Sequence, residues 1–256
     1  MVDDFRTSMK LWRIWFFLSY EDIRTGYRHT LLGPWWSIIN EFVFAIPVCI
    51  LYKKIFKEDG NYYLYVLTGL VIWNFVSSSI LKGMSSLAAS GGYLKEIKLP
   101  FSLFLLQTLS KNCIVFVHGI ALFVLYLIVS QHGVSLILLL VFPYLLLLVM
   151  ALFFWCLIGS ILVLYFRDLL QLLPRILNLL FLTTPIVWHR NVLGDKYQAI
   201  IQLNPMSTLV NIIRKPLLGI APSLHELWVT LAIIVVGFLL CMVIYRLTKN
   251  KLIFLT

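Results

Sequence analysis

The sequence predicts an all-α integral membrane protein. Hydrophobic residues make up 61% of its 256 positions and charged residues only 12%, with a mean hydropathy of +0.94. Because soluble domains usually carry about a quarter charged residues, this composition excludes a soluble class. The apolar residues form long runs, and a charged amphipathic segment precedes the first of them. The net charge of the chain is +10. Its basic residues lie at the ends of the apolar runs, so membrane topology explains this charge better than nucleic-acid binding does.

Six apolar stretches are candidate transmembrane helices, since a membrane helix needs roughly 20 mostly apolar residues. They are Leu31–Tyr52, Tyr62–Leu81, a span within Pro100–Val129, Ser135–Phe166, Leu169–Trp188 and Leu227–Tyr245. No Lys, Arg, Asp or Glu occurs between Asn112 and Phe166, so the turn at 130–133 must separate the third span from the fourth. Six crossings place both termini on one side of the membrane.

The distribution of basic residues predicts which side that is. The N-terminal segment, the second-to-third connection, the fourth-to-fifth junction and the tail hold 14 Lys and Arg residues, and the opposite loops hold 7. Basic residues accumulate on the cytoplasmic side of membrane proteins, so cytoplasmic termini are expected. The N-terminal residues are polar, so the first span, and no cleavable signal, is expected to direct insertion.

The segment Lys10–Trp36 predicts an amphipathic helix on the membrane surface. Its charged residues recur at spacings of three, four and seven, and aromatic and aliphatic residues fill the other side. Gly26 weakens the middle of this helix, and Gly33-Pro34 provides a hinge into the first span. A plain membrane anchor is the alternative interpretation.

Several side chains within the apolar runs are candidates for a transport path. The carboxylate of Glu41 is costly inside a membrane unless it faces a polar interior, so it either lines a conduit or is protonated or hydrogen-bonded to a neighbouring helix. Trp35, Trp36 and Trp73 are aromatic candidates for lining the same path. An interfacial aromatic belt is the alternative for Trp35 and Trp36, and core packing or lipid contact is the alternative for Trp73.

The stretch His189–Pro222 contains apolar segments too short to cross a membrane and broken by Pro205 and Pro216. It predicts a re-entrant helical hairpin on the outer face, with an amphipathic loop resting on lipid as the alternative.

Sequence signatures of catalysis are missing from the chain. No glycine begins a phosphate-binding loop, and the histidines never reach metal-ligand spacing, so no metal site is expected. The four cysteines stand singly in apolar runs and are expected to be small core residues.

Four ordered motifs carry a resemblance to a known family. They are Tyr20–Trp36, the loop Ser90–Pro100, the triplet region Tyr165–Leu169, and Thr183–Trp188 followed by Asn204-Pro205. Together they resemble the Wzm-like membrane subunits of bacterial type-2 ABC exporters for O-antigen, capsular polysaccharide and teichoic acid. The sequence departs from that pattern in having Glu21-Asp22 where Arg-Asp is usual, and Asn40-Glu41 where Asn-Pro is common.

The resemblance implies roles for individual residues. The loop resembles the coupling helix that sits in a groove of the ATPase, and Arg24 and Arg28 could attract the diphosphate of a lipid carrier, with headgroup anchoring as the alternative. The implied ATPase-coupling residues are Tyr93, Leu94, Lys95, Glu96, Ile97, Lys98, Glu21 and Asp22; the substrate-path candidates are Arg24, Arg28, Gly33, Trp35, Trp36, Glu41 and Trp73; Arg167 and Asp168 form a cytoplasmic junction motif.

The resemblance also implies the assembly and its cargo. The expected protein is a single domain, with an interface helix over 1–30, five spans over 31–188, an outer gate over 189–222, and the sixth span and tail over 223–256. It would form a homodimer in the bacterial inner membrane, bind two ABC ATPase subunits and export lipid-linked polysaccharide, with O-antigen as the first choice. The chain itself is expected to hold no cofactor, because ATP and Mg²⁺ belong to the ATPase. An ion-coupled transporter or flippase and a membrane-embedded glycosyl- or acyltransferase are the alternatives.

Overall fold

The described part of the chain is helical throughout. The computed structural model describes residues 2–33, 35–56, 62–90, 99–129, 133, 135–188 and 204–255, and no strand occurs among them. The helices are α1 (Val2–Lys10), α2 (Trp12–Gly26), α3 (Trp35–Phe56), α4 (Tyr62–Ala89), α6 (Phe101–Val129), the 3-10 helix η1 (Leu136–Leu140), α7 (Val141–Tyr165), α8 (Leu169–Thr183), α10 (Pro205–Leu217) and α11 (Leu224–Leu255). The predicted all-α class is confirmed.

Four helices are long and apolar enough to cross a membrane, judged by length and composition over the described residues. They cover Tyr62–Ala89, Phe101–Val129, Leu136–Tyr165 and Leu224–Thr248, which match the predicted second, third, fourth and sixth spans. The chain is therefore a multi-pass membrane protein.

The predicted first and fifth spans correspond to α3 and α8. Helix α3 has 22 residues and α8 only 15, or about 22 Å at ~1.5 Å per residue, shorter than a hydrocarbon core of about 30 Å. The prediction that the fifth helix reaches Trp188 is wrong. Thr184 is extended, with φ −93° and ψ 132°, because a residue before proline is disfavoured in the helical region.

Helix α4 is the centre of the bundle. It packs against α3, α6, α7, α8 and α10. Of its most apolar stretch 67% is buried, against 22–28% for the other three membrane-length helices. A Cβ at Gly83 would lie 3.0 Å from Cys156 Cβ, so the close approach of α4 to α7 depends on the missing side chain. The cysteines are free, and Cys49, Cys156 and Cys241 are buried in the core, as expected.

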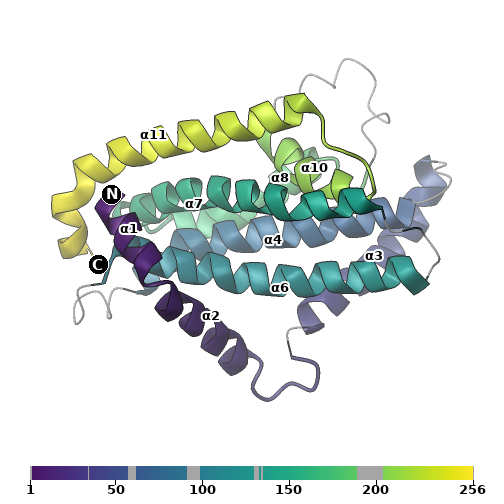
Figure 1. The fold of residues 1–256 in the computed structure, drawn as a ribbon, viewed down its shortest axis with the longest axis horizontal. Coiled ribbons are helices and arrows are strands. Elements are labelled where there is room, and N and C mark those ends of the chain that lie inside the picture. The colour runs from purple at the N-terminus through teal and green to yellow at the C-terminus, as the bar shows by residue number, and fades with distance from the viewer. Residues whose placement is uncertain are drawn as a thin grey trace.

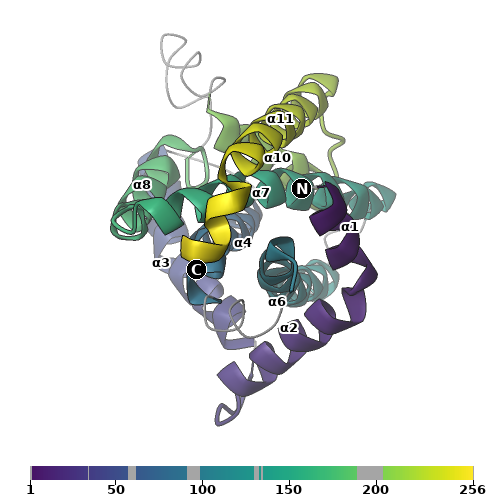
Figure 2. The ribbon, with the colours of Figure 1, turned by 90° about the vertical axis from the view of Figure 1, so that its left-hand side faces the viewer.

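The region 1–30, which the sequence predicted as one interface helix, forms two helices, α1 and α2. Helix α2 ends at Gly26, so this glycine terminates the helix instead of weakening its middle. Helix α2 lies obliquely beside the bundle (Figures 1 and 2) and packs on α6, where Ser19 Oγ donates to the Gln107 carbonyl at 2.8 Å. Trp12, Phe16 and Phe17 are exposed on it, as on a helix at a membrane surface.

Helix α1 holds the beginning of α6. The Asp4 carboxylate accepts the backbone N–H of Phe101 at 3.0 Å and of Ser102 at 3.1 Å, and the Ser102 hydroxyl at 2.6 Å. Ser8 and Ser102 share a further buried hydroxyl bond at 2.7 Å. An acidic side chain from a distant helix therefore satisfies the free donors of the first turn of α6.

The two termini lie at the same end of the bundle, as an even number of crossings requires (Figures 1 and 2). We call this the termini end. Helix α10 lies toward the opposite end. Residues 189–203 of the predicted hairpin lie outside the described residues, and α10 is the part that follows them. Asn204 caps α10 through its Oδ1, and Leu209, Ile212 and Ile213 are buried, so this helix packs into the bundle and does not rest on lipid.

Candidate functional site

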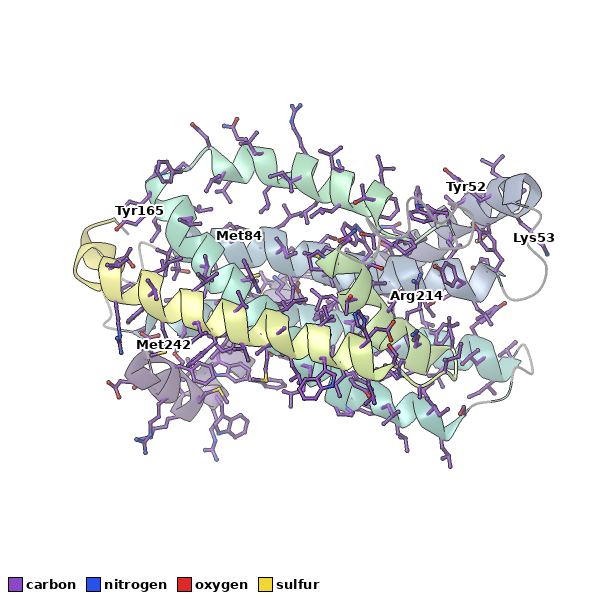
Figure 3. The ribbon with its side chains drawn as sticks, turned by 90° about the horizontal axis from the view of Figure 1, so that it is seen from above. Tyr52, Lys53, Met84, Tyr165, Arg214 and Met242 are labelled. Carbon is purple, nitrogen blue, oxygen red and sulfur yellow. The ribbon has the colours of Figure 1, made fainter. Side chains whose placement is uncertain are left out.

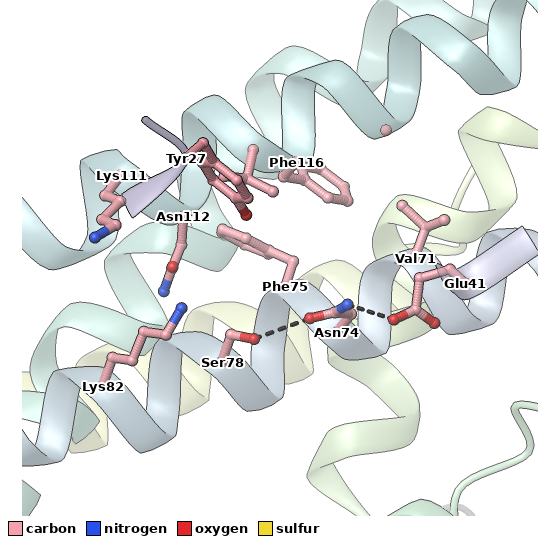
Figure 4. A pocket seen from close by; sticks show the side chains of 12 residues that line it. Tyr27, Glu41, Val71, Asn74, Phe75, Ser78, Lys82, Lys111, Asn112 and Phe116 are labelled. Carbon is pink, nitrogen blue, oxygen red and sulfur yellow. Dashed lines mark hydrogen bonds between the residues drawn. The ribbon is translucent and has the colours of Figure 1, made fainter. Parts of the chain in front are cut away.

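A polar pocket opens between α3, α4 and α6, next to the segment that follows α2. Its volume is about 90 Å³, enough for several waters and too small for a polymer. Figure 4 shows the side chains that line it. The lining residues are Tyr27, Glu41, Val71, Asn74, Phe75, Ser78, Lys82, Lys111, Asn112, Val115, Phe116 and Gly119.

Glu41 lies at one end of this pocket in a chain of hydrogen bonds. Asn74 Nδ2 donates to the Glu41 carboxylate, and Ser78 Oγ donates to Asn74 Oδ1 at 2.9 Å (Figure 4). These bonds join α3 to α4. Glu41 is thus hydrogen-bonded to a neighbouring helix, as one of the two expectations has it, and it faces a pocket; its place in a conduit stays a prediction.

Lys82 and Lys111 lie at the other end of the pocket (Figure 4). The Lys111 ammonium is 3.7 Å from the Asp22 carboxylate, which also accepts Gln107 Nε2 at 3.0 Å. Lys82 has no ion pair among the described residues. Two ammonium groups with a single carboxylate, Asp22, paired to one of them leave this end of the pocket with a net positive charge, which suits an anionic ligand.

The predicted arginine sites lie outside the pocket. Arg24 is exposed and pairs with Glu21 at 3.3 Å, and Arg28 is exposed at the turn after α2. Asp22 binds α6 through Gln107, as above. Gly33 has a φ of 55°, which lies in the left-handed region that favours glycine. It lies at the hinge that the sequence predicted. Contacts with a lipid diphosphate and with an ATPase stay predictions for these residues.

The three candidate tryptophans occupy different environments. Trp36 is exposed, whereas the Trp35 ring meets His118 of α6 edge-on with centroids 5.0 Å apart. Trp73 packs between α4 and α8, with its ring 5.7 Å from Phe181. Of the two alternatives for Trp73, core packing describes its position.

Helix α8 turns a polar stripe away from the bundle. Leu173 and Leu177 bury its inner face, while Gln171, Arg175 and Asn178, spaced four and three residues apart, are exposed on the opposite face. Hydrocarbon disfavours such a stripe, so it favours contact with water or with another polar surface. Arg167 and Asp168 precede α8 and are exposed, with Asp168 at the N-cap position, where its side chain makes no capping bond.

A buried arginine ties α10 to α4. Arg214 is 3% exposed; its Nη1 donates to the Pro185 carbonyl at 2.8 Å, and its Nη2 donates to Asn211 Oδ1. The guanidinium carbon lies 4.0 Å from the Tyr65 ring centroid, and Tyr65 Oη also donates to Pro185 O at 2.8 Å. Burial lowers the pKa of Arg214, and Tyr65 acts in the opposite direction. Figure 3 shows Arg214 within the bundle.

The predicted coupling residues, Tyr93, Leu94, Lys95, Glu96, Ile97 and Lys98, lie outside the described residues. Their neighbours are α4 and α6, the two helices that carry Lys82 and Lys111. The loop therefore connects the two lysine-bearing walls of the pocket.

Sequence reasoning missed most of the pocket, although one signal was available. Asn74, Ser78 and Lys82 are spaced four residues apart and so mark a polar face on an apolar helix. Tyr27 and Asn112 carried no such signal, since only the fold brings them to the pocket.

Comparison with known proteins gives consistent results. The family described as ABC-2 type transporter matches residues 13–218. The chain is 27% identical over 195 residues to a protein of Klebsiella pneumoniae named O-antigen export system permease protein RfbA, covering 75% of each chain. A protein of the same name in Myxococcus xanthus is 23% identical over 197 residues, again with 75% of each chain covered.

Proposed function

The chain belongs to the ABC-2 type transporter family, and from this premise we propose that it is the permease subunit of an ATP-driven exporter of lipid-linked polysaccharide. It is a membrane transport subunit, and its family implies an ABC ATPase as partner. O-antigen is the first candidate cargo, because the relatives of Klebsiella and Myxococcus carry that name. The four motifs of the sequence support the same cargo class.

The polar stripe of α8 is the observation that supports a conduit. Gln171, Arg175 and Asn178 point away from the bundle that buries the other face of α8. A second copy related by a two-fold axis would place two such stripes face to face and enclose a polar path. The 90 Å³ pocket cannot itself pass a polymer. The conduit of this proposal therefore lies between two permease subunits.

The proposed topology has six crossings in the bacterial inner membrane, with α3 as the first, and with α8 together with the non-helical residues 184–188 as the fifth. Both termini lie at one end of the bundle, and the 14 to 7 distribution of basic residues favours a cytoplasmic location for them. Reporter fusions after Thr256 and near Asp195 should report cytoplasm and periplasm respectively. A cytoplasmic signal at Asp195 would contradict six crossings.

The proposed motor is a pair of separate ATPase subunits that bind ATP and Mg²⁺. Their closure would push on the loop Gly91–Pro100 and on α2, and thereby move the helices that follow. Helix α2 contacts α6 directly, so a force on either element reaches α6.

The test of this function is ATP-dependent export in proteoliposomes that hold the permease and its ATPase. Gln171→Leu combined with Asn178→Leu should abolish most export, because an apolar wall no longer solvates a sugar chain. Leu172→Ala and Leu179→Ala, at exposed apolar positions of the same helix, should export nearly normally. Normal export by the first variant would remove α8 from the conduit, and export that persists without the ATPase would favour an ion-coupled transporter.

A further inference from the structure

Helix α1 is joined to the first turn of α6 by a compact set of hydrogen bonds. The Asp4 carboxylate accepts the backbone N–H groups of Phe101 and Ser102 and the Ser102 hydroxyl, and the Ser8 hydroxyl shares a further bond with that of Ser102. We call these bonds the α1–α6 contact. Ser8 and Ser102 are buried, and a hydrogen bond shielded from water is stronger than an exposed one. The contact therefore fixes the position of α1 on α6.

A second set of bonds continues the attachment along α2. Trp15 Nε1 donates to the Ser8 carbonyl at 3.1 Å, which ties α2 to α1. Further along, Ser19 Oγ donates to the Gln107 carbonyl at 2.8 Å, and Asp22 accepts Gln107 Nε2 at 3.0 Å. The α1–α2 pair thus binds α6 at both ends of its first two turns or so. Bonds at two separate places prevent α6 from rotating against this pair.

The packing of α6 against α4 is of a different kind. The rings of Phe116 and Phe75 stack with centroids 4.7 Å apart, within the apolar core. Apolar packing is non-directional, and packed helices can slide along each other by small amounts. Asn112 Nδ2 donates to Ser79 Oγ at 3.2 Å, but a bond between uncharged groups is weaker than a bond to a carboxylate. Movement is therefore easier between α6 and α4 than between α6 and α1.

Helix α1 also touches α7, through an aromatic pair. The Phe5 ring centroid lies 5.2 Å from that of Phe153. Because this contact is non-directional as well, it can adjust to a displacement that the hydrogen bonds of Asp4 would resist. Helix α1 should therefore follow α6 when α6 moves relative to α7.

The α1–α6 contact lies next to the loop on which the proposed ATPase acts. The loop 91–100 ends where α6 begins, and Phe101 and Ser102 are the two residues that follow it. A force on this loop reaches the contact before it reaches the rest of α6. Both helices meet at the termini end (Figure 1). The family match begins at residue 13, so α1 precedes the residues to which the family assigns a role.

We propose that Asp4 is a positioning residue for ATP-driven export. It holds α1 on the first turn of α6, so that α1, α2 and the beginning of α6 move as one unit when the ATPase closes. This inference rests on the proposed function, because it gives Asp4 a part in transmitting the force of that ATPase. Without the carboxylate, three donors at the start of α6 lose their acceptor, and the force unwinds this turn instead of moving the helix. ATP hydrolysis then continues without moving polysaccharide.

The first test measures export per ATP hydrolysed by the permease–ATPase complex in proteoliposomes, well below its melting temperature. Asp4→Ala should lower this ratio by roughly fivefold or more, the effect of one lost helix cap on an equilibrium, while ATP hydrolysis stays near normal. Asp4→Asn should recover most of the ratio, because asparagine caps a helix about as well as aspartate. Asp3→Ala, on the exposed side of α1, should keep the full ratio. An unchanged ratio in Asp4→Ala, or equal falls in hydrolysis and export, would refute the positioning role.

The second test restores the contact with a covalent bond. The Ser8 and Ser102 hydroxyl oxygens lie 2.7 Å apart, so cysteines at these positions can form a disulfide. In the Asp4→Ala background, Ser8→Cys combined with Ser102→Cys should stay uncoupled when reduced and regain export per ATP when oxidised. Ser8→Cys alone should not respond to the oxidant. Uncoupling that persists with the disulfide formed, or a pair that forms no disulfide, would refute the proposal.

The positioning role and the proposed function can fail separately. If the unsubstituted complex exports polysaccharide and Asp4→Ala does so at an unchanged ratio, the positioning role alone is wrong. If the unsubstituted complex exports none, the proposed function is wrong, and spin-label distances then decide the role of Asp4. Labels at Lys10 of α1 and Val117 of α6, both exposed, should keep a constant distance on ATP binding, but not in Asp4→Ala. A distance that changes in the unsubstituted protein would show that α1 and α6 do not move as one unit.

Discussion

The strongest prediction of the structure concerns the buried guanidinium of Arg214. This group contacts the Pro185 carbonyl after α8, Asn211 within α10 and the ring of Tyr65 on α4. One side chain therefore connects three segments at the end of the bundle opposite the termini. Replacing it by methionine keeps an unbranched apolar side chain and removes the charge, the planar fork and the stacking.

The expected loss follows from these contacts. A hydrogen bond to a charged group contributes about 1.5–3 kcal/mol, and a desolvated guanidinium on an aromatic face contributes about 2 kcal/mol. Part of this gross loss is recovered, since a buried charge no longer has to be desolvated. The free energy of unfolding should fall by ~2 kcal/mol, which for a chain of this size lowers the melting temperature by about 4–8 °C.

Arg214→Lys should do no better than Arg214→Met. Lysine keeps the desolvation cost, but its compact ammonium cannot donate in two directions while stacking on Tyr65. Melting temperatures of purified protein in detergent measure the effect, and Arg214→Met should be compared with Arg246→Met on exposed α11. If Arg214→Lys melts at the same temperature as the unsubstituted protein, the positive charge alone holds α10 in place and the planar geometry of the guanidinium is not needed.

Three further predictions concern other residues. Asp4→Ala should destabilise the protein by about 0.5–2 kcal/mol, the usual cost of losing a helix cap, whereas Asp3→Ala should be neutral in the same melting assay; equal effects would mean that α1 does not cap α6. Glu41→Gln should retain substantial export, since an amide oxygen still accepts from Asn74, and Glu41→Lys should not; equal loss of export would indicate an essential negative charge. Asp at both Tyr93 and Leu94 should abolish co-purification with the ATPase while insertion continues; normal ATPase binding and export would exclude this loop as the coupling element.

Much of the bundle could be predicted from hydropathy because lipid imposes a strict length requirement on each apolar run. The spans that became α4, α6, α7 and α11 are found where the sequence placed them. The end of α8 was also encoded, since Thr184 precedes Pro185 and a residue in that position rarely stays helical. Hydropathy alone obscured it, because the apolar run continues to Trp188.

The long-range contacts could not be predicted from local patterns. Asp4 caps a helix that starts 97 residues later, and Tyr65 stacks under Arg214 about 150 residues away. Residues at such separations share no period, so a single sequence gives no signal that pairs them. The lysine pocket was missed for the same reason, because Lys82 and Lys111 lie on different helices.

The position of the predicted coupling loop links the motor to the pocket. The loop joins the end of α4 to the start of α6, so a push on it acts on the two helices that carry Lys82 and Lys111. Helix α4 is wedged among five neighbours, and a much larger share of it is buried than of α6. Helix α6 is instead held at its first turn by Asp4 and along its side by α2, both of which lie at the termini end. A force from that end should therefore displace α6 while α4 stays in place. This movement would change the distance between the Lys82 and Lys111 ammonium groups, and with it the strength with which they bind an anion.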